Sequence, residues 1–332
     1  MSEAMETFAR TTMADRMGDR GFHTGLIEAI REQLSIDYDK AATQTAASTF
    51  EAHSGNCLSL VILTAAFAKH FDVPFQYQYV YKEGAWSRAA GLAFYSGHVN
   101  LRLGPSVLET WLRRTTREVL TVDFLDPSAP ARQRVRVIPE ERIVAMYLNN
   151  RAAEAMVEDD LDDSYWQARA ALQADPGFTS AYNTLGVVYR RHGDLPQAER
   201  ALQRALEREP ANANVLSNLI VVLEAMGRTD DARDARARLV SLAPYPPFYF
   251  LDEGLAAAGR GDYEVALGLF ERELERMPYD DELHFAIAVA ELHLGQVRQA
   301  RRHVSLAIEN STQRDRRNIY AAKLSYLESL SN

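Results

Sequence analysis

The chain has 332 residues, of which 47% are hydrophobic and 25% charged, and its formal net charge at pH 7 is −9. This length and composition are typical of a soluble protein with about two domains. A net negative charge disfavours nucleic acid and anionic membranes as partners, because both carry phosphate charges of the same sign. The longest apolar run, Leu58–Ala68, is much shorter than the ~20 residues that a membrane-spanning helix needs.

The N-terminal 20 residues are polar and of mixed charge, without the apolar stretch of a secretory signal. We therefore expect a cytoplasmic protein from the sequence as written, and a periplasmic protein or lipoprotein if the N-terminus is truncated. The sequence has no spacing typical of metal ligands, no glycine-rich phosphate loop and no serine nucleophile elbow. We predict neither a metal nor a cofactor.

Residues 1–24 look like a loose N-terminal lead, and a folded domain is expected over residues 25–140. In this domain an apolar run opens at Cys57 and ends near His70, which is long enough for a buried helix. The next segment, Phe75–Tyr81, alternates in the manner of a strand. The predicted fold class is α+β, with a core helix packed on an antiparallel sheet.

Cys57 is the only cysteine of the chain, so it can form neither an internal disulfide nor a multi-cysteine zinc site. A free cysteine is most often a small buried hydrophobic residue. The position of Cys57, at the first turn of a buried helix, supports a second interpretation. Unpaired N–H groups and the helix dipole favour negative charge there, so Cys57 is a candidate thiolate nucleophile.

A thiolate nucleophile needs a base, and the base needs a partner that orients it. His98 opens a segment of alternating apolar residues, and Asp123 lies in a second short strand further along the chain. Two adjacent antiparallel strands would place His98 and Asp123 side by side. A helix end packed against that sheet would bring Cys57 to the other nitrogen of the ring.

The order of a cysteine at a helix start, a strand with His-Val and a strand ending in Asp resembles the transglutaminase-like branch of the papain-like cysteine enzymes. The likeness covers residues 25–130. Some bacterial proteins carry such a domain ahead of a region of helical repeats. The resemblance implies that Cys57 is the nucleophile, His98 the general base and acid, and Asp123 the residue that orients the imidazole.

Two positions depart from the family pattern. Asn100 stands where members often have Trp, and Asp126-Pro127 provides an alternative acid. We favour Asp123 because it lies inside the apolar strand, where such an acid would be buried. We expect the backbone N–H of Cys57 to be one oxyanion donor. Possible cleft-lining residues are Asn56, His53, Gln76, Gln78, Asn100 and Trp86.

The second half of the chain repeats every 34 residues. Alanines and glycines recur at this step, and so do the prolines Pro176, Pro210, Pro244 and Pro278. This period predicts five helix pairs in residues 145–312, with units starting near Ala145, Thr179, Ala213, Pro247 and Asp281, and a capping helix in residues 313–332.

The best-formed unit, Thr179–Asn212, resembles the tetratricopeptide repeat (TPR). Its first helix carries Leu185-Gly186, and Gly186 and Ala198 are small because the two helices cross closely. The resemblance implies an all-α solenoid in which the first helices of the units line a groove for a protein or peptide partner. The candidate groove residues are Tyr182, Asn183, Tyr189, Arg190, Asn218 and Glu224.

These features support two functions. The first is a cysteine-dependent acyl transfer, as in an amide or peptide hydrolase or a transglutaminase, on a protein or peptide that the repeats recruit. The alternative is a non-catalytic TPR adaptor with a degenerate transglutaminase-like domain. The substrate, the acyl acceptor and the oligomeric state do not follow from the sequence.

Overall fold

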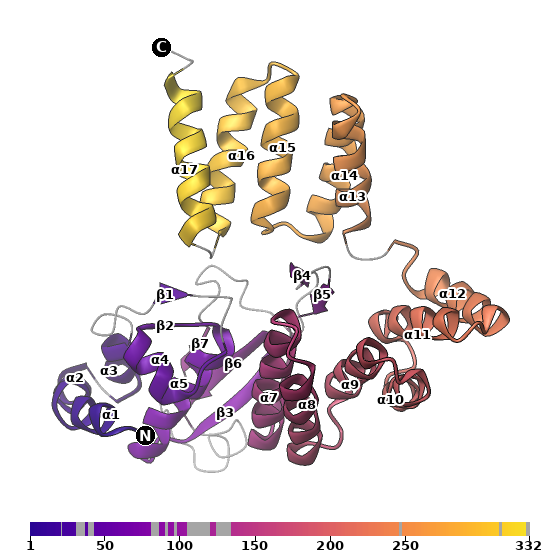
Figure 1. Ribbon diagram of the computed structural model, residues 1–332. Coiled ribbons are helices and arrows are strands. Elements are labelled where there is room, and N and C mark those ends of the chain that lie inside the picture. The colour runs from indigo at the N-terminus through magenta and orange to yellow at the C-terminus, as the bar shows by residue number, and fades with distance from the viewer. Residues whose placement is uncertain are drawn as a thin grey trace. The chain divides into compact units, whose positions relative to one another are not determined.

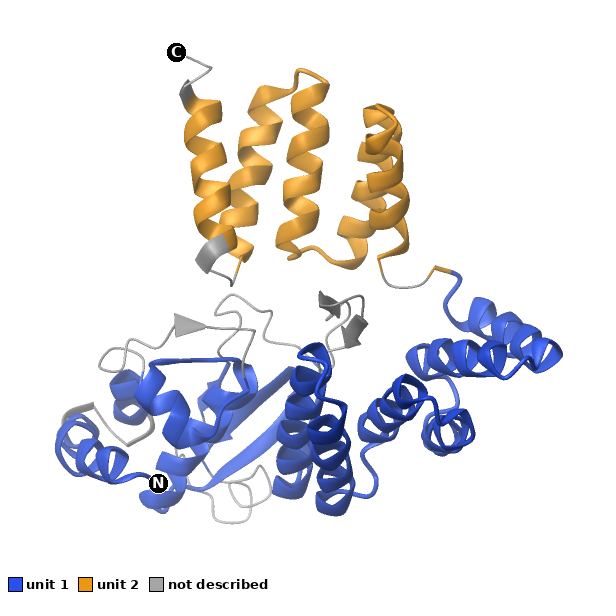
Figure 2. Ribbon diagram, in the orientation of Figure 1, with its two compact units in different colours: residues 1–81, 97–244 blue, residues 82–96, 245–332 orange. Residues whose placement is uncertain are grey.

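The computed structural model describes residues 1–20, 22–30, 37–38, 43–80, 86–89, 92–95, 98–104, 120–123, 134–245, 248–311 and 314–329. The chain forms two compact units (Figure 2). Unit 1 comprises Met1–Tyr81 and Gly97–Pro244, and unit 2 comprises Lys82–Ser96 and Tyr245–Asn332. Among the helices in the described ranges, none is both long and apolar enough to cross a bilayer.

The N-terminal residues are helical, which differs from the loose lead predicted for residues 1–24. They form α1 (Glu3–Phe8), the π-helical segment η1 (Ala9–Met13), α2 (Ala14–Arg20) and α3 (Phe22–Glu28). The physical reason is a stripe of apolar side chains at every fourth position, which helical structure buries in the core of unit 1. The stripe consists of Met5, Ala9, Met13 and Met17.

The predicted core helix is present as α5 (Cys57–His70). It follows two short parallel strands, β1 (Asp37–Tyr38) and β2 (Ser54–Gly55), and helix α4 (Ala46–Ala52). Asn56 is the N-cap of α5, and its side-chain oxygen accepts a hydrogen bond from the Ser59 backbone N–H at 2.9 Å. This cap satisfies one of the N–H groups that have no partner within the helix.

A four-stranded antiparallel sheet in the order β7-β6-β3-β8 packs against α5 (Figure 1). The strands are β3 (Phe75–Val80), β6 (His98–Leu103), β7 (Leu120–Val122) and β8 (Val135–Ile138). Val99, Leu101 and Leu103 alternate along β6 and are buried in one core with Phe67 of α5. A separate hairpin, β4 (Trp86–Ala89) with β5 (Leu92–Tyr95), belongs to unit 2.

The second half of the chain consists of consecutive helix pairs. The pairs in unit 1 are α7 (Glu140–Val157) with α8 (Leu161–Ala174), α9 (Thr179–His192) with α10 (Leu195–Arg208), and α11 (Ala213–Ala225) with α12 (Thr229–Leu242). Those in unit 2 are α13 (Tyr249–Gly259) with α14 (Tyr263–Arg276) and α15 (Asp281–His293) with α16 (Val297–Asn310). Helix α17 (Arg314–Ser329) packs on α16 where a capping helix was predicted.

The first pair departs from the 34-residue frame at two places. Helix α7 begins at Glu140, ahead of the predicted unit start at Ala145, because Pro139 precedes it and two glutamates occupy its first turn. In the later pairs a glycine with positive φ ends the first helix or follows it, as at Gly193 with φ 89°. Asp159, one period earlier, adopts a φ of 64°, a conformation that aspartate tolerates better than most residues.

Small residues let the two helices of a pair approach closely, as predicted for Gly186. A Cβ atom at Gly186 would lie 2.5 Å from Cγ of Leu202 on α10. Two periods later, a Cβ at Gly254 on α13 would collide with the ring of Phe270 on α14. Both partner side chains are fully buried, so neither can move without disturbing the core.

We predict that Gly254→Ala lowers the free energy of unfolding of unit 2 by about 1–3 kcal/mol, because the added methyl group overpacks the contact with Phe270. Gly268→Ala on α14 is the matched control, since nothing lies within 4 Å of its Cβ position. There the replacement stabilises the helix by about 0.5–1 kcal/mol. Urea denaturation followed by circular dichroism measures both, and a shift in the same direction would contradict the close packing.

Candidate functional site

Cys57 is the first residue of α5 and is half-buried. Its backbone N–H belongs to the first turn, whose N–H groups find no acceptor within the helix. The preceding residue, Asn56, caps the helix with its side chain. The thiol therefore lies where the positive end of the helix dipole meets the sheet.

His98 and Asp123 lie side by side and form the second part of the site, next to the part that Cys57 provides. Antiparallel pairing places Leu101 of β6 opposite Val122 of β7. The next residue of the chain, Asp123, therefore lies near the start of β6, where His98 is. The His98 Nε2 and Asp123 Oδ2 atoms are 2.7 Å apart, and the side chains are 3% and 17% exposed. A hydrogen bond so sheltered from water fixes the plane of the imidazole ring.

The environment of His98 changes its protonation. Burial alone would lower its pKa, but the hydrogen bond to Asp123, the interaction with Cys57 and the charges of both raise the pKa to about 9. His98 is therefore an imidazolium at neutral pH. This is the protonation state that a thiolate beside it would stabilise.

The second ring nitrogen of His98, Nδ1, is buried and meets the full geometry of a hydrogen bond with no described residue, although the Cys57 thiol is close enough to raise the His98 pKa through such an interaction. Because Asp123 occupies Nε2, Nδ1 is the nitrogen that remains for proton exchange with Cys57 or with a bound molecule. An unsatisfied buried polar atom of this kind is costly unless something else uses it.

Three of the predicted cleft-lining residues lie on the same pair of strands. Gln78 of β3 is opposite Asn100 of β6, and the two are 8% and 4% exposed. The Asn100 Oδ1 atom is buried and has no hydrogen-bond partner among the described residues. One step along the sheet, Gln76 accepts a hydrogen bond from Arg102 at 3.1 Å. Gln78 and Asn100 thus form a buried carboxamide pair in the strands next to His98.

The other predicted residues have different places. Asn56, predicted to line the cleft, is buried and caps α5. His53 is the exposed C-cap of α4, and its ring contacts Phe50. Trp86 lies in β4 of unit 2, where its side chain is outside the described residues, and the alternative acid Asp126 is outside them entirely.

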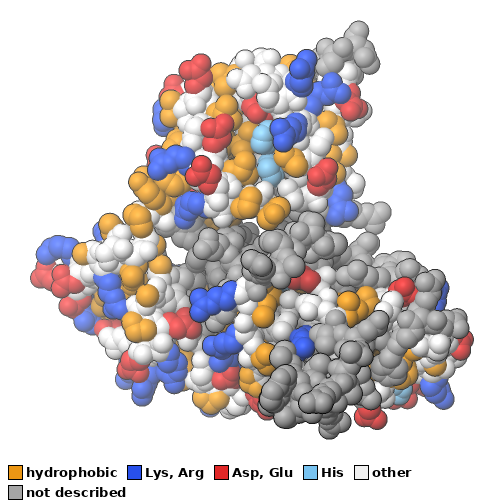
Figure 3. All heavy atoms as spheres, turned by 180° about the vertical axis from the view of Figure 1, so that it is seen from behind, with side chains coloured by type: hydrophobic (Ala, Val, Ile, Leu, Met, Phe, Trp, Pro, Cys, Tyr) orange, Lys and Arg blue, Asp and Glu red, His pale blue; other side chains and the backbone are white. Residues whose placement is uncertain are grey.

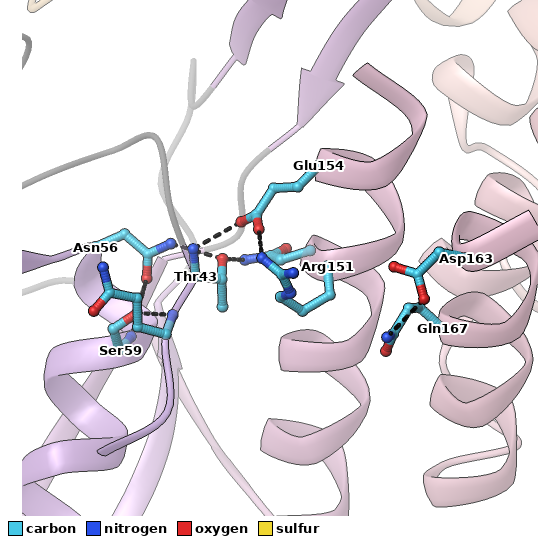
Figure 4. A network of polar contacts seen from close by, with 9 residues as sticks. Thr43, Asn56, Ser59, Arg151, Glu154, Asp163 and Gln167 are labelled. Atoms are coloured by element: carbon cyan, nitrogen blue, oxygen red, sulfur yellow. Dashed lines mark hydrogen bonds and ion pairs between the residues drawn. The ribbon is translucent and has the colours of Figure 1, made fainter. Parts of the chain in front are cut away.

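A residue that sequence reasoning missed is Thr43. Its hydroxyl oxygen accepts a hydrogen bond from Asn56 Nδ2 at 2.8 Å, and its backbone N–H donates to Glu154 Oε1 of α7 at 2.7 Å (Figure 4). No local pattern signals this role, because the contact joins residues 111 positions apart.

The first helices of the repeats in unit 1 are joined by two polar contacts of the same kind. Thr184 of α9 donates to Asn149 Oδ1 of α7 at 2.8 Å, and Asn218 of α11 donates to Asn183 Oδ1 of α9 at 2.9 Å. Both contacts join residues 35 positions apart. The predicted groove residues Asn183 and Asn218 are thereby brought together.

Three of the four remaining groove candidates have partners on second helices. The Arg208 guanidinium lies 4.7 Å from the ring of Tyr182, and Tyr189 makes an edge contact with Tyr165 at 5.8 Å. Exposed Glu224 forms an ion pair with Arg236 of α12. Arg190 is half-buried, and its Nε atom has no hydrogen-bond partner among the described residues.

In the described ranges, no group of three or more His, Cys, Asp or Glu side chains is arranged to hold a metal ion. The two candidate sites are the cysteine–histidine pair and the row of first helices α7, α9 and α11, both in unit 1. Within the described part of the chain, neither site has the donor set of a resident metal.

The tetratricopeptide repeat family matches residues 183–247 and 251–315. The C-terminal region thus consists of TPR repeats, as the sequence predicted. These matched residues lie outside residues 25–130, so the transglutaminase-like resemblance and the papain-like fold remain predictions.

One curated relative is the cellulose synthase operon protein C of Pseudomonas fluorescens (strain SBW25), 29% identical over 139 residues. The match covers 40% of this chain and only 11% of that protein. Among solved structures, Pseudomonas aeruginosa PilF is 19% identical with a TM-score of 0.33, covering 57% of this chain and 87% of PilF. A TPR protein of Thermus thermophilus is 18% identical with the same TM-score, covering 54% and 98%. At such distances these structures carry no argument about function.

The raised pKa of His98 predicts a pH dependence of stability. An imidazole with a pKa of about 9 when folded and about 6.5 when unfolded stabilises the fold fully below pH 6.5. That contribution, up to about 3 kcal/mol, is lost as the pH rises through 9. We expect the free energy of unfolding to fall between pH 6.5 and 9 in the wild type and to stay flatter in His98→Asn.

Urea denaturation at pH 6, 7.5 and 9 measures this difference. His70→Asn is the control, because His70 is exposed at the other end of α5. Cys57→Ser should reduce the slope, since Cys57 is one cause of the raised pKa. Parallel curves for wild type and His98→Asn would contradict the assignment.

Proposed function

We propose that the repeats of this chain dock an extended peptide segment of a partner protein along their first helices. The observation that carries this proposal is the repeated contact of Thr184 with Asn149 and of Asn218 with Asn183. It lines up half-buried amide and hydroxyl groups from helix to helix. Such groups can exchange hydrogen bonds with the main chain of a bound peptide.

Apolar side chains at one position of the repeat provide a second kind of contact. Val221, Leu255 and Val289 stand 34 residues apart on α11, α13 and α15, and they are 44%, 50% and 37% exposed. Val221 in unit 1 and, separately, Leu255 with Val289 in unit 2 are each suited to contact an apolar side chain of a peptide. The equivalent residue of α9, Val187, is buried.

The arginine Arg190 indicates that the bound peptide also carries a negative charge. Arg190 lies two turns after Asn183 on the same face of α9, and its Nε has no partner among the described residues. A carboxylate of the peptide would satisfy this guanidinium. On the face seen in Figure 3, acidic and basic side chains are interspersed over the repeat helices, which does not favour a polyanion such as nucleic acid.

The docking proposal predicts that Val221→Glu weakens peptide binding about tenfold or more, because the new carboxylate would be desolvated against apolar side chains. The probe is a peptide selected on the wild-type protein from a random-sequence display library, with binding measured by fluorescence anisotropy. Val240→Glu is the matched control, since Val240 is 56% exposed on the second helix α12. Selected peptides that bind both variants equally would refute docking along the first helices.

A second candidate function is cysteine-dependent acyl transfer at Cys57. The observation that favours it is the 2.7 Å contact between His98 Nε2 and Asp123 Oδ2, which leaves a buried Nδ1 beside the cysteine helix. An orienting carboxylate, an imidazole and a thiol are the three groups that this chemistry requires.

In the proposed reaction, the Cys57 thiolate attacks the carbonyl carbon of a carboxamide or peptide bond. The protonated His98 then gives its proton to the leaving amine as the C–N bond breaks, and an acyl-thioester remains. His98, now neutral, takes a proton from water or from an acceptor amine, which attacks the thioester and releases Cys57. Asp123 holds the ring and stabilises its charged form throughout.

The backbone N–H of Cys57 is the proposed donor to the oxyanion that forms in the first step. The carboxamides of Gln78 and Asn100 lie in the strands next to His98 and could hydrogen-bond the amide group of the substrate. In this scheme the repeats select the protein that carries the bond to be attacked. The docking function does not require this chemistry, so each can be tested without the other.

The acyl-transfer proposal predicts that iodoacetamide alkylates Cys57 faster than free cysteine at pH 7. The expected rate in His98→Ala is lower by about tenfold or more, because the imidazolium no longer stabilises the thiolate. His70→Ala, at the exposed end of the same helix, should react like the wild type. A wild-type rate no higher than that of free cysteine, or no loss in His98→Ala, would refute this chemistry.

A further inference from the structure

We propose that Thr43 is a positioning residue for Cys57, which couples the N-terminal cap of α5 to the repeat helix α7. This inference rests on the proposed acyl transfer, because it concerns the placement of the nucleophile. Thr43 belongs to neither element, and it hydrogen-bonds both (Figure 4).

On the side of the cysteine helix, Thr43 orients Asn56. Asn56 Nδ2 donates to Thr43 Oγ1 at 2.8 Å, so the opposite end of the amide, Oδ1, faces the helix. Oδ1 accepts from the Ser59 backbone N–H and from Ser59 Oγ, each at 2.9 Å. Ser59 Oγ in turn accepts from the Gln44 backbone N–H at 2.8 Å. Each donor has an acceptor only in this orientation of the Asn56 amide.

On the side of the repeats, two residues of α7 hold Thr43. Its backbone N–H donates to Glu154 Oε1 at 2.7 Å, and its hydroxyl oxygen accepts a second hydrogen bond from Asn150 Nδ2 at 3.2 Å. Glu154 is itself fixed by Arg151, whose Nη1 donates to Oε2 at 2.6 Å. Both the backbone and the side chain of Thr43 therefore follow the position of α7.

Because the centre of the network is buried, losing one of these hydrogen bonds is costly in free energy. Thr43 is 3% exposed, Asn56 8% and Ser59 0%, so water cannot replace a lost partner at the centre of the network. Removing the Thr43 hydroxyl would leave the amides of Asn56 and Asn150 without their acceptor. Asn56 would then lose the orientation in which it caps α5.

The position of this cap matters because the proposed catalytic groups sit on separate elements. His98 is fixed to the sheet through Asp123, whereas Cys57 follows Asn56 at the start of α5. A shift of the first turn of α5 changes the separation of sulfur and imidazole, and such misplacements of about 1 Å reduce rates strongly.

Helix α7 also takes part in the row of first helices. Asn149, which accepts the hydrogen bond from Thr184, is next to Asn150, which donates to Thr43. One turn of α7 thus contributes Asn149 to the row of first helices where the peptide is proposed to dock, and Asn150 to the network that positions Cys57. A partner bound along the first helices would act on the same element that holds the cap.

The test measures the rate of alkylation of Cys57 by iodoacetamide from pH 5 to 9 in the full-length chain. We expect Thr43→Val to lower the rate at pH 7 about fivefold or more and to shift the pH profile. Thr43→Ser keeps the hydroxyl and should stay within about twofold of the wild type. Glu154→Ala removes the acceptor for the Thr43 backbone N–H. It should also lower the rate, although it changes no residue of α5 and leaves the Thr43 side chain in place.

Two controls remove hydrogen bonds of the same kind elsewhere. Thr45→Val deletes a threonine cap of the neighbouring helix α4, where the Thr45 hydroxyl accepts from the Ser48 backbone N–H. Gln167→Ala removes the hydrogen bond that Gln167 donates to Asp163 on α8, which is drawn in Figure 4 and lies outside the network. Both variants should react at the wild-type rate, and circular dichroism checks that all variants fold.

The outcomes separate this inference from the function on which it rests. A slow Thr43→Val, a restored Thr43→Ser and unaffected controls would support the positioning role. Wild-type rates in Thr43→Val and Glu154→Ala, with a slow His98→Ala, would overturn it and leave acyl transfer standing. Equal losses in Thr43→Val and Thr45→Val would overturn it as general destabilisation. A wild-type Cys57 no more reactive than free cysteine would overturn both.

Discussion

The hydrogen bond between His98 and Asp123 is the constraint on which the candidate site depends. It joins the start of β6 to the end of β7 and leaves one ring nitrogen for Cys57 or a ligand. The pair is largely buried, so its geometry depends on the register of the sheet, which in turn depends on the packing of the sheet against α5. The charge of the imidazole is a consequence, since Asp123 and Cys57 outweigh the effect of burial on its pKa.

The second half of the site depends on a helix end. Cys57 is placed by α5, whose cap is held through Thr43 by a helix of the first repeat. The part of unit 1 that precedes α7, residues 1–81 and 97–139, is the head of the chain; it forms one compact unit with the first repeats and shares polar contacts with them. This arrangement explains why the boundary between the predicted domains, near residues 140–145, is not a flexible linker: α7 begins there and packs its buried residues into the core of the head.

Much of this could be predicted where the signal is local. The apolar run after Cys57, the alternation after His98 and the 34-residue period each indicate a helix, a strand or a repeat frame within a short window. The N-terminal helices also carry a local signal, because the apolar residues Met5, Ala9, Met13 and Met17 recur at every fourth position, although the prediction of a loose lead did not use it. The role of Thr43 was not predictable, because it arises from hydrogen bonds between residues more than 100 positions apart.

The free energy that the buried polar groups around His98 cost bears on the choice between adaptor and enzyme. A head that served only as a scaffold would be as stable, or more so, with an apolar pair in place of His98 and Asp123. It would also gain nothing from the buried Asn100 Oδ1 atom, which no described residue satisfies and which costs desolvation free energy. These costs are understandable if a substrate supplies the missing partners. The cost of these buried groups has no bearing on the docking function of the repeats, because docking a peptide needs only the first helices.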